Sequence, residues 1–252
     1  MSRSRTALFL TILLPLSVVA DEGLIIAVAS NFRTAAEEIA SEFTNVSQIP
    51  VRISAGSTGM LYAQIVNGAP YDVFLAADAR RPQLLEEAGV AVSGSRTGYA
   101  TGSLVLWSAD SALANQSCIE VLKSGSYRRI AVANPLTAPY GLAAEEFLKA
   151  IGVYDEASKR MAYGENIAQT LQFVASGNAT LGLIAASQVA DGLPEPGSCS
   201  WNVPAELHSA IDQQAVVISN SKKLVAAQRF MEFLQSPQVA SILRRRGYGL
   251  PQ

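Results

Sequence analysis

Residues 54–78, with the sequence SAGSTGMLYAQIVNGAPYDVFLAAD, show the pattern on which the whole chain is built. A loop of small and hydroxyl-bearing residues, Gly56-Ser57-Thr58-Gly59, leads into a short amphipathic helix in which Leu61 and Ile65 share one face. The turn sequence NGAP ends the helix, and the apolar residues 73–75 follow as a buried strand. A hydroxyl-rich loop at the start of a helix offers free backbone N–H groups, a positive dipole end and side-chain donors, which together favour an anion. An ordinary Ser/Thr helix cap has the same sequence, so the interpretation depends on whether the loop recurs.

The alternation of strand and helix extends to both sides of this segment. The apolar run at 24–28 predicts a strand buried on both faces, as in a parallel sheet. Apolar residues recur at helical spacing from 32 to 43, and a second strand is expected at 51–53. Beyond the third strand, Asp78 caps a helix that Gly89 ends. Strands and helices that alternate with short loops predict a doubly wound α/β unit.

A second α/β unit begins near Gly102. Its expected elements are strands at 104–107, 130–132 and 181–184 and helices that begin near 139 and 167. After a loop at 192–200, a strand at 215–219 is expected to return to the first unit, and two helices with apolar faces close the chain. The predicted domains are one lobe of residues 21–101 plus 213–252 and a second lobe of residues 102–212.

The first twenty residues are expected to lie outside the fold. Two arginines precede an apolar run at 7–19, which ends in small residues. This pattern is typical of a secretory signal peptide spanning residues 1–20, with the mature protein starting near Asp21. A membrane anchor is the alternative, but Pro15 interrupts the run, which is also short for a full span.

Charge and cysteine content exclude several classes of partner. Removing Arg3 and Arg5 from the 19 basic residues leaves 17 against 21 acidic ones, a net charge of −4, and no basic patch indicates nucleic-acid binding. Cys118 and Cys199 are consistent with one disulfide in an oxidising compartment, although two free thiols remain an alternative. The single histidine, His208, has no ligand cluster around it, so no site for a bare metal ion is expected.

Small, polar strand-to-helix junctions recur in both predicted units. They are residues 29–31, 56–59, 138–141 and 165–167. In open α/β sheets, ligands bind outside the carboxyl ends of the strands, where such junctions converge. Four unrelated helix caps are the alternative, but two junctions in each unit favour one shared site.

The composition of these junctions indicates which anion they suit. They contain no Lys, Arg or His, so backbone N–H and hydroxyl groups would hold the charge. Such a site has donors and almost no acceptors, which suits a fully deprotonated oxyanion such as sulfate, molybdate or tungstate. Phosphate near neutral pH keeps a proton and needs an acceptor. Glu165 is one candidate acceptor, but we expect it beside its loop rather than at the tip.

Three strings resemble the periplasmic molybdate-binding proteins, the substrate-binding components of molybdate ABC importers. They are AVASNF at 27–32, GSTGMLYAQIVNGAPYDVFLAAD at 56–78 and the NP…PYG pattern at 134–141. The resemblance covers the chain from about Gly23 to its end. It implies a type II periplasmic binding protein fold, with two lobes, a hinge crossed twice and an oxyanion in the cleft. It further implies a periplasmic location, an inner-membrane ABC permease as partner, no cofactor and a monomer.

The resemblance also implies a set of ligand residues. They are Ser30, Asn31, Ser57, Thr58, Tyr140 and Ile167. The first four belong to the two hydroxyl-bearing loops of the first lobe, with Ser30 and Thr58 as the matching hydroxyls; the last two supply backbone N–H groups from the second lobe. Some family members add a late tyrosine where this chain has Ala185. Either Asn31 or Tyr140 then compensates, or the selectivity among oxyanions differs.

Three other functions are alternative hypotheses. A secreted hydrolase needs a general base beside its nucleophile, and nothing in the sequence places His208 near Ser57. An effector-sensing domain of a regulator needs a fused DNA-binding segment, whereas a signal peptide is expected at the N-terminus. A binding protein for sulfate, chromate or ferric iron shares the fold, but iron favours paired tyrosines, and Tyr140 and Tyr163 are weak support.

Overall fold

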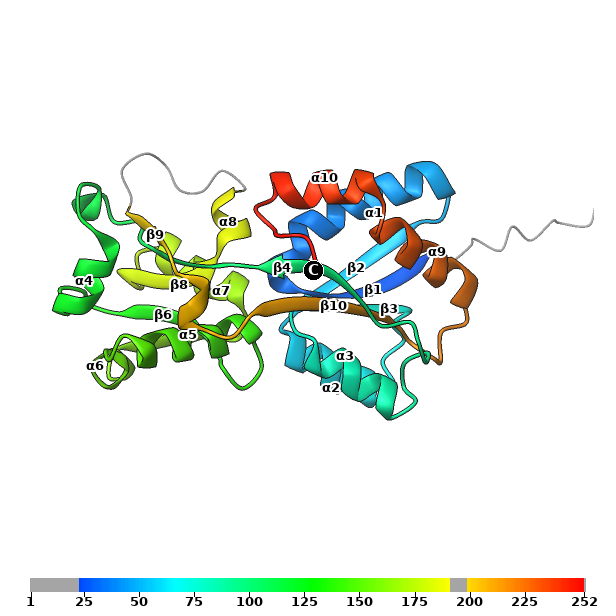
Figure 1. The fold of residues 1–252 in the computed structure, drawn as a ribbon, viewed down its shortest axis with the longest axis horizontal. Coiled ribbons are helices and arrows are strands. Elements are labelled where there is room, and N and C mark those ends of the chain that lie inside the picture. The colour runs from blue at the N-terminus through cyan, green and yellow to red at the C-terminus, as the bar shows by residue number, and fades with distance from the viewer. Residues whose placement is uncertain (1–22, 191–198, 252) are drawn as a thin grey trace, which may run out of the picture.

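The computed structural model describes residues 23–190 and 199–251. These residues form two α/β lobes, each a five-stranded sheet flanked by helices (Figure 1). The predicted signal peptide, residues 1–20, lies outside the described residues, as does most of the loop predicted at 192–200. Among the helices that the structure describes, none combines the length and the apolar character needed to span a membrane.

The first lobe combines the start of the described chain with its end. Its strands are β1 (Leu24–Ala29), β2 (Val51–Gly56), β3 (Val73–Ala76), β4 (Thr97–Gly102) and β10 (Ile211–Val217). Its helices are the 3₁₀ turn η1 (Ser30–Phe32), α1 (Arg33–Ser47), α2 (Thr58–Val66), α3 (Arg80–Glu87), α9 (Leu224–Leu234) and α10 (Pro237–Arg245). The strand order is β2-β1-β3-β10-β4, with β1 parallel to β2 and β3, and β10 antiparallel to β3 and β4.

The second lobe repeats this plan with the middle of the chain. Its strands are β5 (Leu104–Trp107), β6 (Ile130–Ala133), β7 (Met161–Gly164), β8 (Leu181–Ala185) and β9 (Ser200–Asn202). Its helices are η2 (Ser111–Leu113), α4 (Cys118–Ser124), α5 (Pro139–Ala150), α6 (Tyr154–Ser158), α7 (Ile167–Ala175), α8 (Ala186–Ala190) and η3 (Ala205–Leu207). The order is β7-β6-β8-β5-β9, and β6 runs parallel to β7 and β8.

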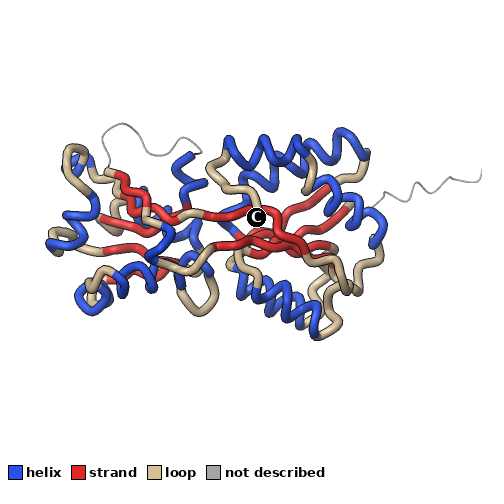
Figure 2. Tube along the Cα trace, in the orientation of Figure 1, coloured by secondary structure: helices blue, strands red, loops and turns tan. Residues whose placement is uncertain are grey.

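The apolar strands predicted from the sequence form the centres of the two sheets. All residues of β3, β5, β6 and β8 are buried, and β1 is buried at all but one position. On one face of the first sheet, α1 packs against α9 through an edge-to-face contact of Phe43 with Phe230, whose ring centroids are 5.2 Å apart. Helices α2 and α3 cover the other face (Figure 2). Burial of these apolar side chains is the main term that stabilises each lobe.

Three strands were not predicted from the sequence: β4, β7 and β9. Each lies at the edge of its sheet, where one side of the backbone is unpaired and the apolar run of a central strand is not required. The returning strand β10 also begins at Ile211 rather than 215, because polar side chains from Asp212 to Gln214 interrupt its apolar pattern. Ser200, predicted to be in a loop, begins β9.

The chain passes between the lobes twice, between β4 and β5 and between β9 and β10 (Figure 1).

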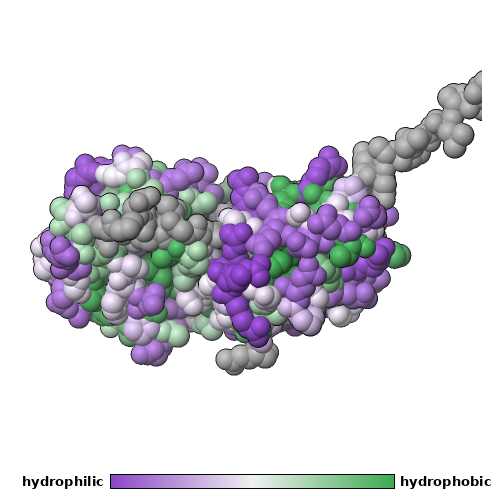
Figure 3. Space-filling view, turned by 90° about the horizontal axis from the view of Figure 1, so that it is seen from above, coloured by the Kyte–Doolittle hydropathy of each residue, from purple (hydrophilic) through white to green (hydrophobic). Residues whose placement is uncertain are grey.

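Polar contacts hold the ends of two helices in the first lobe. Asp78 Oδ1 accepts a hydrogen bond from the Arg81 N–H (2.9 Å) and so caps α3, although the N-cap position itself is occupied by Ala79. At the other end of the chain, Arg245 and Arg246 bind Glu38 of α1 at 2.7 and 2.8 Å. The lobe that carries α1 and α10 is predominantly hydrophilic on the face shown in Figure 3.

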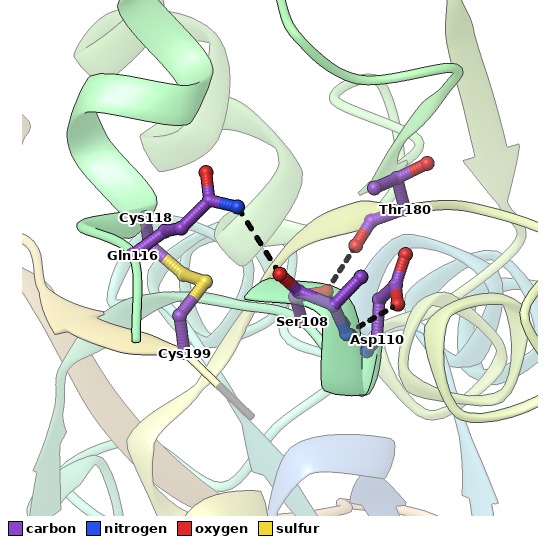
Figure 4. Close-up of a disulfide and its surroundings, with 7 residues drawn as sticks. Ser108, Asp110, Gln116, Cys118, Thr180 and Cys199 are labelled. Carbon is purple, nitrogen blue, oxygen red and sulfur yellow. Dashed lines mark hydrogen bonds between the residues drawn. A yellow bond between two sulfur atoms is a disulfide. The ribbon is translucent and has the colours of Figure 1, made fainter. Parts of the chain in front are cut away.

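A disulfide joins Cys118, the first residue of α4, to Cys199, which precedes the edge strand β9 (Figure 4). The two Cα atoms are 5.6 Å apart, and 81 residues separate them in sequence. Ser108 supports the same region, because its N–H donates to the Cys199 carbonyl (3.0 Å) and its Oγ donates to the Thr180 carbonyl (2.6 Å). The disulfide therefore anchors the edge strand β9 of the second lobe to α4.

Candidate functional site

A small cavity lies where the carboxyl ends of β1, β2 and β3 face the first turns of α5 and α7. Its volume is about 10 Å³. Its lining residues are Ala29, Ser30, Asn31, Gly56, Ser57, Thr58, Ala77, Ala138, Pro139, Tyr140 and Ile167. All six residues singled out in the sequence are therefore brought to one place, three loops of the first lobe facing two of the second.

The loop between β2 and α2 places two hydroxyl groups at this cavity. Ser57 is the N-cap of α2, but its side chain makes no capping hydrogen bond. Its Oγ is buried and has no partner among the described residues. Thr58 is equally buried, and its Oγ1 accepts a hydrogen bond from the Ala77 N–H (3.1 Å), which leaves the hydroxyl proton for another acceptor. A buried hydroxyl without a partner is costly, so Ser57 is a clear donor for a bound ligand.

The loop after β1 is held from both lobes. The Asn31 carbonyl accepts hydrogen bonds from the Tyr248 hydroxyl (2.6 Å), near the C-terminus, and from the Ser187 hydroxyl (3.4 Å) of α8 in the second lobe. Asn31 is buried and Ser30 is half-buried. These contacts fix the first-lobe loop against its partner lobe.

The second lobe contributes the first turns of two helices. The first N–H groups of a helix have no acceptor within the helix. In α7, the Asn166 side chain accepts from the N–H groups of Ala168 and Gln169 (3.0 and 3.1 Å), so it does not cap that of Ile167. In α5, Pro139 is at the first position and the N-cap Ala138 has no capping side chain, which leaves the Tyr140 N–H uncapped.

Close packing brings these helix ends to the cavity. A methyl group at Gly141 would lie 2.3 Å from the Ala133 carbonyl oxygen, so only glycine lets α5 start against the end of β6. Gln188 braces α7, because its Nε2 donates to the Ile167 carbonyl (3.1 Å) and its Oε1 accepts from the Ala185 N–H (3.0 Å). Ala185 is fully buried and does not line the cavity.

The cavity has neutral walls. None of its lining residues is charged; Asp78, which follows Ala77, pairs with Arg81, and Glu165 is exposed outside the lining. Burial raises the pKa of the Tyr140 hydroxyl well above its usual value, so this group remains protonated. The cavity therefore offers hydrogen-bond donors without a cation and without a carboxylate acceptor, as a fully deprotonated anion requires.

The two lobes also contact each other next to the cavity. The Gly59 N–H in α2 donates to the Thr137 carbonyl of the second lobe (2.8 Å), and Arg81 Nη2 donates to the Leu136 carbonyl (3.1 Å). A groove of about 600 Å³ between the lobes shares Ala77 and Pro139 with the cavity. Sequence patterns did not single out these contacts, because three of the four groups are backbone atoms.

Other polar and titratable side chains of the described residues lie outside the cavity. The carboxylate of Asp72 accepts from the Ile25 N–H (2.7 Å) and the Ser221 hydroxyl (2.6 Å) and so ties the start of β3 to its neighbours. His208 Nδ1 lies 2.8 Å from the Ser209 carbonyl and does not line the cavity with Ser57. Within the described residues, no group of three or more His, Cys, Asp or Glu side chains could hold a metal ion.

Comparison with known proteins agrees with this geometry. The sequence profile of the family described as "Bacterial extracellular solute-binding protein" matches residues 24–249. The chain belongs to this family. It is 43% identical over 225 residues to the molybdate-binding protein ModA of Azotobacter vinelandii, a match that covers 89% of each protein. It is 42% identical over 243 residues to ModA of Rhodobacter capsulatus, covering 96% of this chain and 94% of that protein.

A solved structure extends the likeness to three dimensions. The Azotobacter vinelandii periplasmic molybdate-binding protein matches this solute-binding protein with a TM-score of 0.86 and 39% identity, over 91% of this chain and 100% of that one. The predicted resemblance to periplasmic molybdate-binding proteins and the predicted two-lobed type II fold are thereby confirmed.

Proposed function

We propose that this solute-binding protein captures molybdate or tungstate in the cavity and delivers it to the inner-membrane permease of an ABC importer. The observation that carries the proposal is the convergence of neutral donors from both lobes on one small cavity without a charged lining residue. The names of the relatives at 42% and 43% identity, both molybdate-binding proteins, support this choice of anion.

The proposed ligand donors come from both lobes. In the first lobe they are the hydroxyls of Ser30, Ser57 and Thr58 and the side-chain amide of Asn31. In the second lobe they are the backbone N–H groups of Tyr140 and Ile167. Hydrogen bonds to a charged group stabilise a complex more than neutral ones, about 1.5–3 kcal/mol each. A dianion can therefore be held without a counter-charge when it is removed from water and every lone pair meets a donor.

The proposed mechanism is closure of the lobes on the anion. Lobe 1, residues 21–101 plus 213–252, supplies four of these donor residues, and lobe 2, residues 102–212, supplies the other two. The anion is therefore fully coordinated only when both lobes are in contact. The Gly59–Thr137 hydrogen bond then seals the cavity. The closed arrangement, with surfaces of both lobes in fixed register, is what a permease would recognise.

We further propose that the protein is not an enzyme and needs no cofactor. A hydrolase using Ser57 needs a general base within hydrogen-bond reach, and the lining residues include no titratable base. We also propose a periplasmic monomer, exported by the signal peptide at residues 1–20, whose partners do not include nucleic acid.

Calorimetric titration tests the proposal. The secreted protein is titrated with molybdate, tungstate, sulfate, phosphate and chromate at constant pH and ionic strength. We expect tight 1:1 binding of molybdate and tungstate, weaker binding of sulfate, and none of phosphate. Because a ligand that binds only the folded state stabilises it by mass action, the melting temperature should rise with the same order. Tightest binding of sulfate or chromate would reassign the protein to that anion, and no binding of any oxyanion would remove the proposal.

A further inference from the structure

A buried glutamine lies directly behind the cavity. Gln213 is in β10, close to a crossing between the lobes, and only 1% of it is exposed. One end of its side-chain amide contacts both the Tyr99 hydroxyl (3.0 Å) and the side-chain amide of Asn31 (2.9 Å). Gln213 does not line the cavity, whereas Asn31 does. Its hydrogen bond to Asn31 therefore connects it to the lining of the anion site.

The hydrogen atoms available decide how these side chains are oriented. If Gln213 turns its Oε1 toward Tyr99 and Asn31, the single Tyr99 hydroxyl proton is claimed by two acceptors, Gln213 Oε1 (3.0 Å) and the Ala76 carbonyl (3.1 Å). In that orientation, Gln213 Nε2 and the Tyr140 hydroxyl, both buried donors, have no partner among the described residues. Each unsatisfied buried donor costs free energy, so this orientation is unfavourable.

The opposite orientation of the Gln213 amide resolves the conflict. An amide can exchange its oxygen and nitrogen positions by rotating 180°, and the hydrogen-bond network selects between the two. With Nε2 on the inner side, Gln213 donates one proton to the Tyr99 oxygen, and Tyr99 gives its own proton to the Ala76 carbonyl. Oε1 then faces Gly102. The Tyr140 hydroxyl lies on the same side, because a methyl group at Gly102 would be 2.2 Å from Tyr140 Oη and 3.1 Å from this atom of the Gln213 amide. The Tyr140 hydroxyl, a buried donor, and Gln213 Oε1, an acceptor, then lie in the same small space.

This orientation also determines that of Asn31. The second Nε2 proton of Gln213 points at the Asn31 amide atom 2.9 Å away, which must then be the acceptor, Oδ1. The Asn31 Nδ2 group consequently turns to the other side. It gives up a 3.4 Å contact with the Tyr248 hydroxyl, which keeps its 2.6 Å hydrogen bond to the Asn31 carbonyl, and it changes the amide atom that the Asn31 side chain presents to the Tyr140 hydroxyl.

We infer that Gln213 is a positioning residue, which holds Asn31 so that its side-chain N–H group rather than its carbonyl oxygen faces the anion. This inference rests on the proposed function of the cavity. With the amide reversed, a carbonyl oxygen would point at a dianion and repel it. Tyr140 directs its hydroxyl toward Gly102, so Asn31 is the side chain that compensates for the alanine at 185.

A double-mutant cycle tests whether Gln213 acts through Asn31. Molybdate affinity is measured by calorimetry for the wild type, Gln213→Met, Asn31→Ala and the double variant. Methionine matches the length of glutamine but neither donates nor accepts a strong hydrogen bond. We expect Gln213→Met to weaken binding about tenfold in the wild type, the worth of one hydrogen bond, and less than about twofold in the Asn31→Ala background. An equal loss in both backgrounds would mean a merely structural role and overturn the inference.

A second measurement follows the wild-type protein and uses a variant only to assign its signals. The Asn31 side-chain NH₂ signals in a ¹⁵N NMR spectrum are assigned by their loss in Asn31→Ala. We expect these signals to shift on addition of molybdate together with the backbone amides of Tyr140 and Ile167. Shifts of the two backbone amides without any shift of the Asn31 NH₂ group would refute the orientation while leaving the anion site intact. If none of the three shifts with any oxyanion, the proposed function fails, and this inference fails with it.

Discussion

Replacing Gly59 by alanine tests whether closure of the lobes holds the anion. Gly59 is the second residue of α2, and its N–H makes the 2.8 Å hydrogen bond to the Thr137 carbonyl. A methyl group at this position would lie 2.9 Å from Thr137 Cα, 3.0 Å from Thr137 O and 3.1 Å from Arg81 Nη2. Two of these atoms belong to the backbone of the opposite lobe and cannot turn aside. The lobes must therefore separate by a few tenths of an ångström in the closed state.

The structure allows the size of the effect to be worked out. Losing the inter-lobe hydrogen bond costs about 0.5–1.5 kcal/mol, and overpacking costs about 1–3 kcal/mol. We therefore expect the closed complex to lose about 2 kcal/mol or more, which is about a 30-fold weaker affinity for molybdate. The first lobe alone does not lose stability, because alanine is the better helix former by up to about 1 kcal/mol.

Calorimetry and thermal unfolding separate these two effects. Molybdate affinity is measured for Gly59→Ala, and the melting temperature is measured without ligand. Met60→Ala is the matched control: Met60 is the next residue of α2, it is 44% exposed, and it lines neither the cavity nor the groove. We expect Gly59→Ala to bind weakly with an unchanged or raised melting temperature, and Met60→Ala to bind normally. Wild-type affinity in Gly59→Ala would refute the reasoning that the lobes close at this contact.

Three further predictions concern the donors, the disulfide and the acid stability of the fold. Ser57→Ala and Thr58→Ala are each expected to weaken molybdate binding by about 1–3 kcal/mol through loss of a hydrogen bond to a charged group; unchanged affinity in both, measured by calorimetry, would mean that the site lies elsewhere. Replacing Cys118 and Cys199 by serine is expected to lower the free energy of unfolding by about 4 kcal/mol in the chain-entropy model, and equal denaturant midpoints for variant and wild type would contradict this. Burial raises the pKa of Glu38, but the hydrogen bonds and charges of Arg245 and Arg246 at the end of α10 outweigh it, so the pKa is lowered from the ordinary value of 4.5. A lowered pKa adds stability above that value and loses it as the pH falls through the folded-state pKa. Glu38→Gln should therefore lower the melting temperature at neutral pH, and the difference from wild type should shrink below pH 4.5; a difference that persists in stronger acid would show another cause.

Central strands and loop chemistry were predictable from this sequence, while edge strands were not. The runs LIIAVA of β1 and VFLA of β3 are apolar because both faces of a central parallel strand are buried, and this requirement is visible in the residues. The edge strand β4, with the sequence TGYATG, meets no such requirement. Its pairing depends on β10, which is more than a hundred residues away, and local periodicity carries no information about that contact.

Some residues of the candidate site could be predicted from the sequence, and others could not. Ser30, Ser57 and Thr58 could be found because small hydroxyl residues recur at strand-to-helix junctions. Gln213 could not be found, because a polar residue in a strand is usually exposed, and its burial depends on Tyr99, Asn31 and the crossing of the lobes. The difference between the two hydroxyls of the second loop could not be predicted either. Thr58 Oγ1 accepts a hydrogen bond from the Ala77 N–H, which is distant in sequence, whereas Ser57 Oγ has no partner among the described residues.

Anomalous diffraction from crystals grown with tungstate would locate the bound oxyanion. Tungsten scatters strongly enough to be located without any assumption about the site. We expect one tungsten peak in the cavity, with its oxygens in hydrogen-bond contact with the Ser30 and Ser57 hydroxyls and the backbone N–H groups of Tyr140 and Ile167. No Lys, Arg or His side chain should be in contact with it. A peak at another place in the molecule, or an oxyanion held by a positively charged side chain, would contradict it.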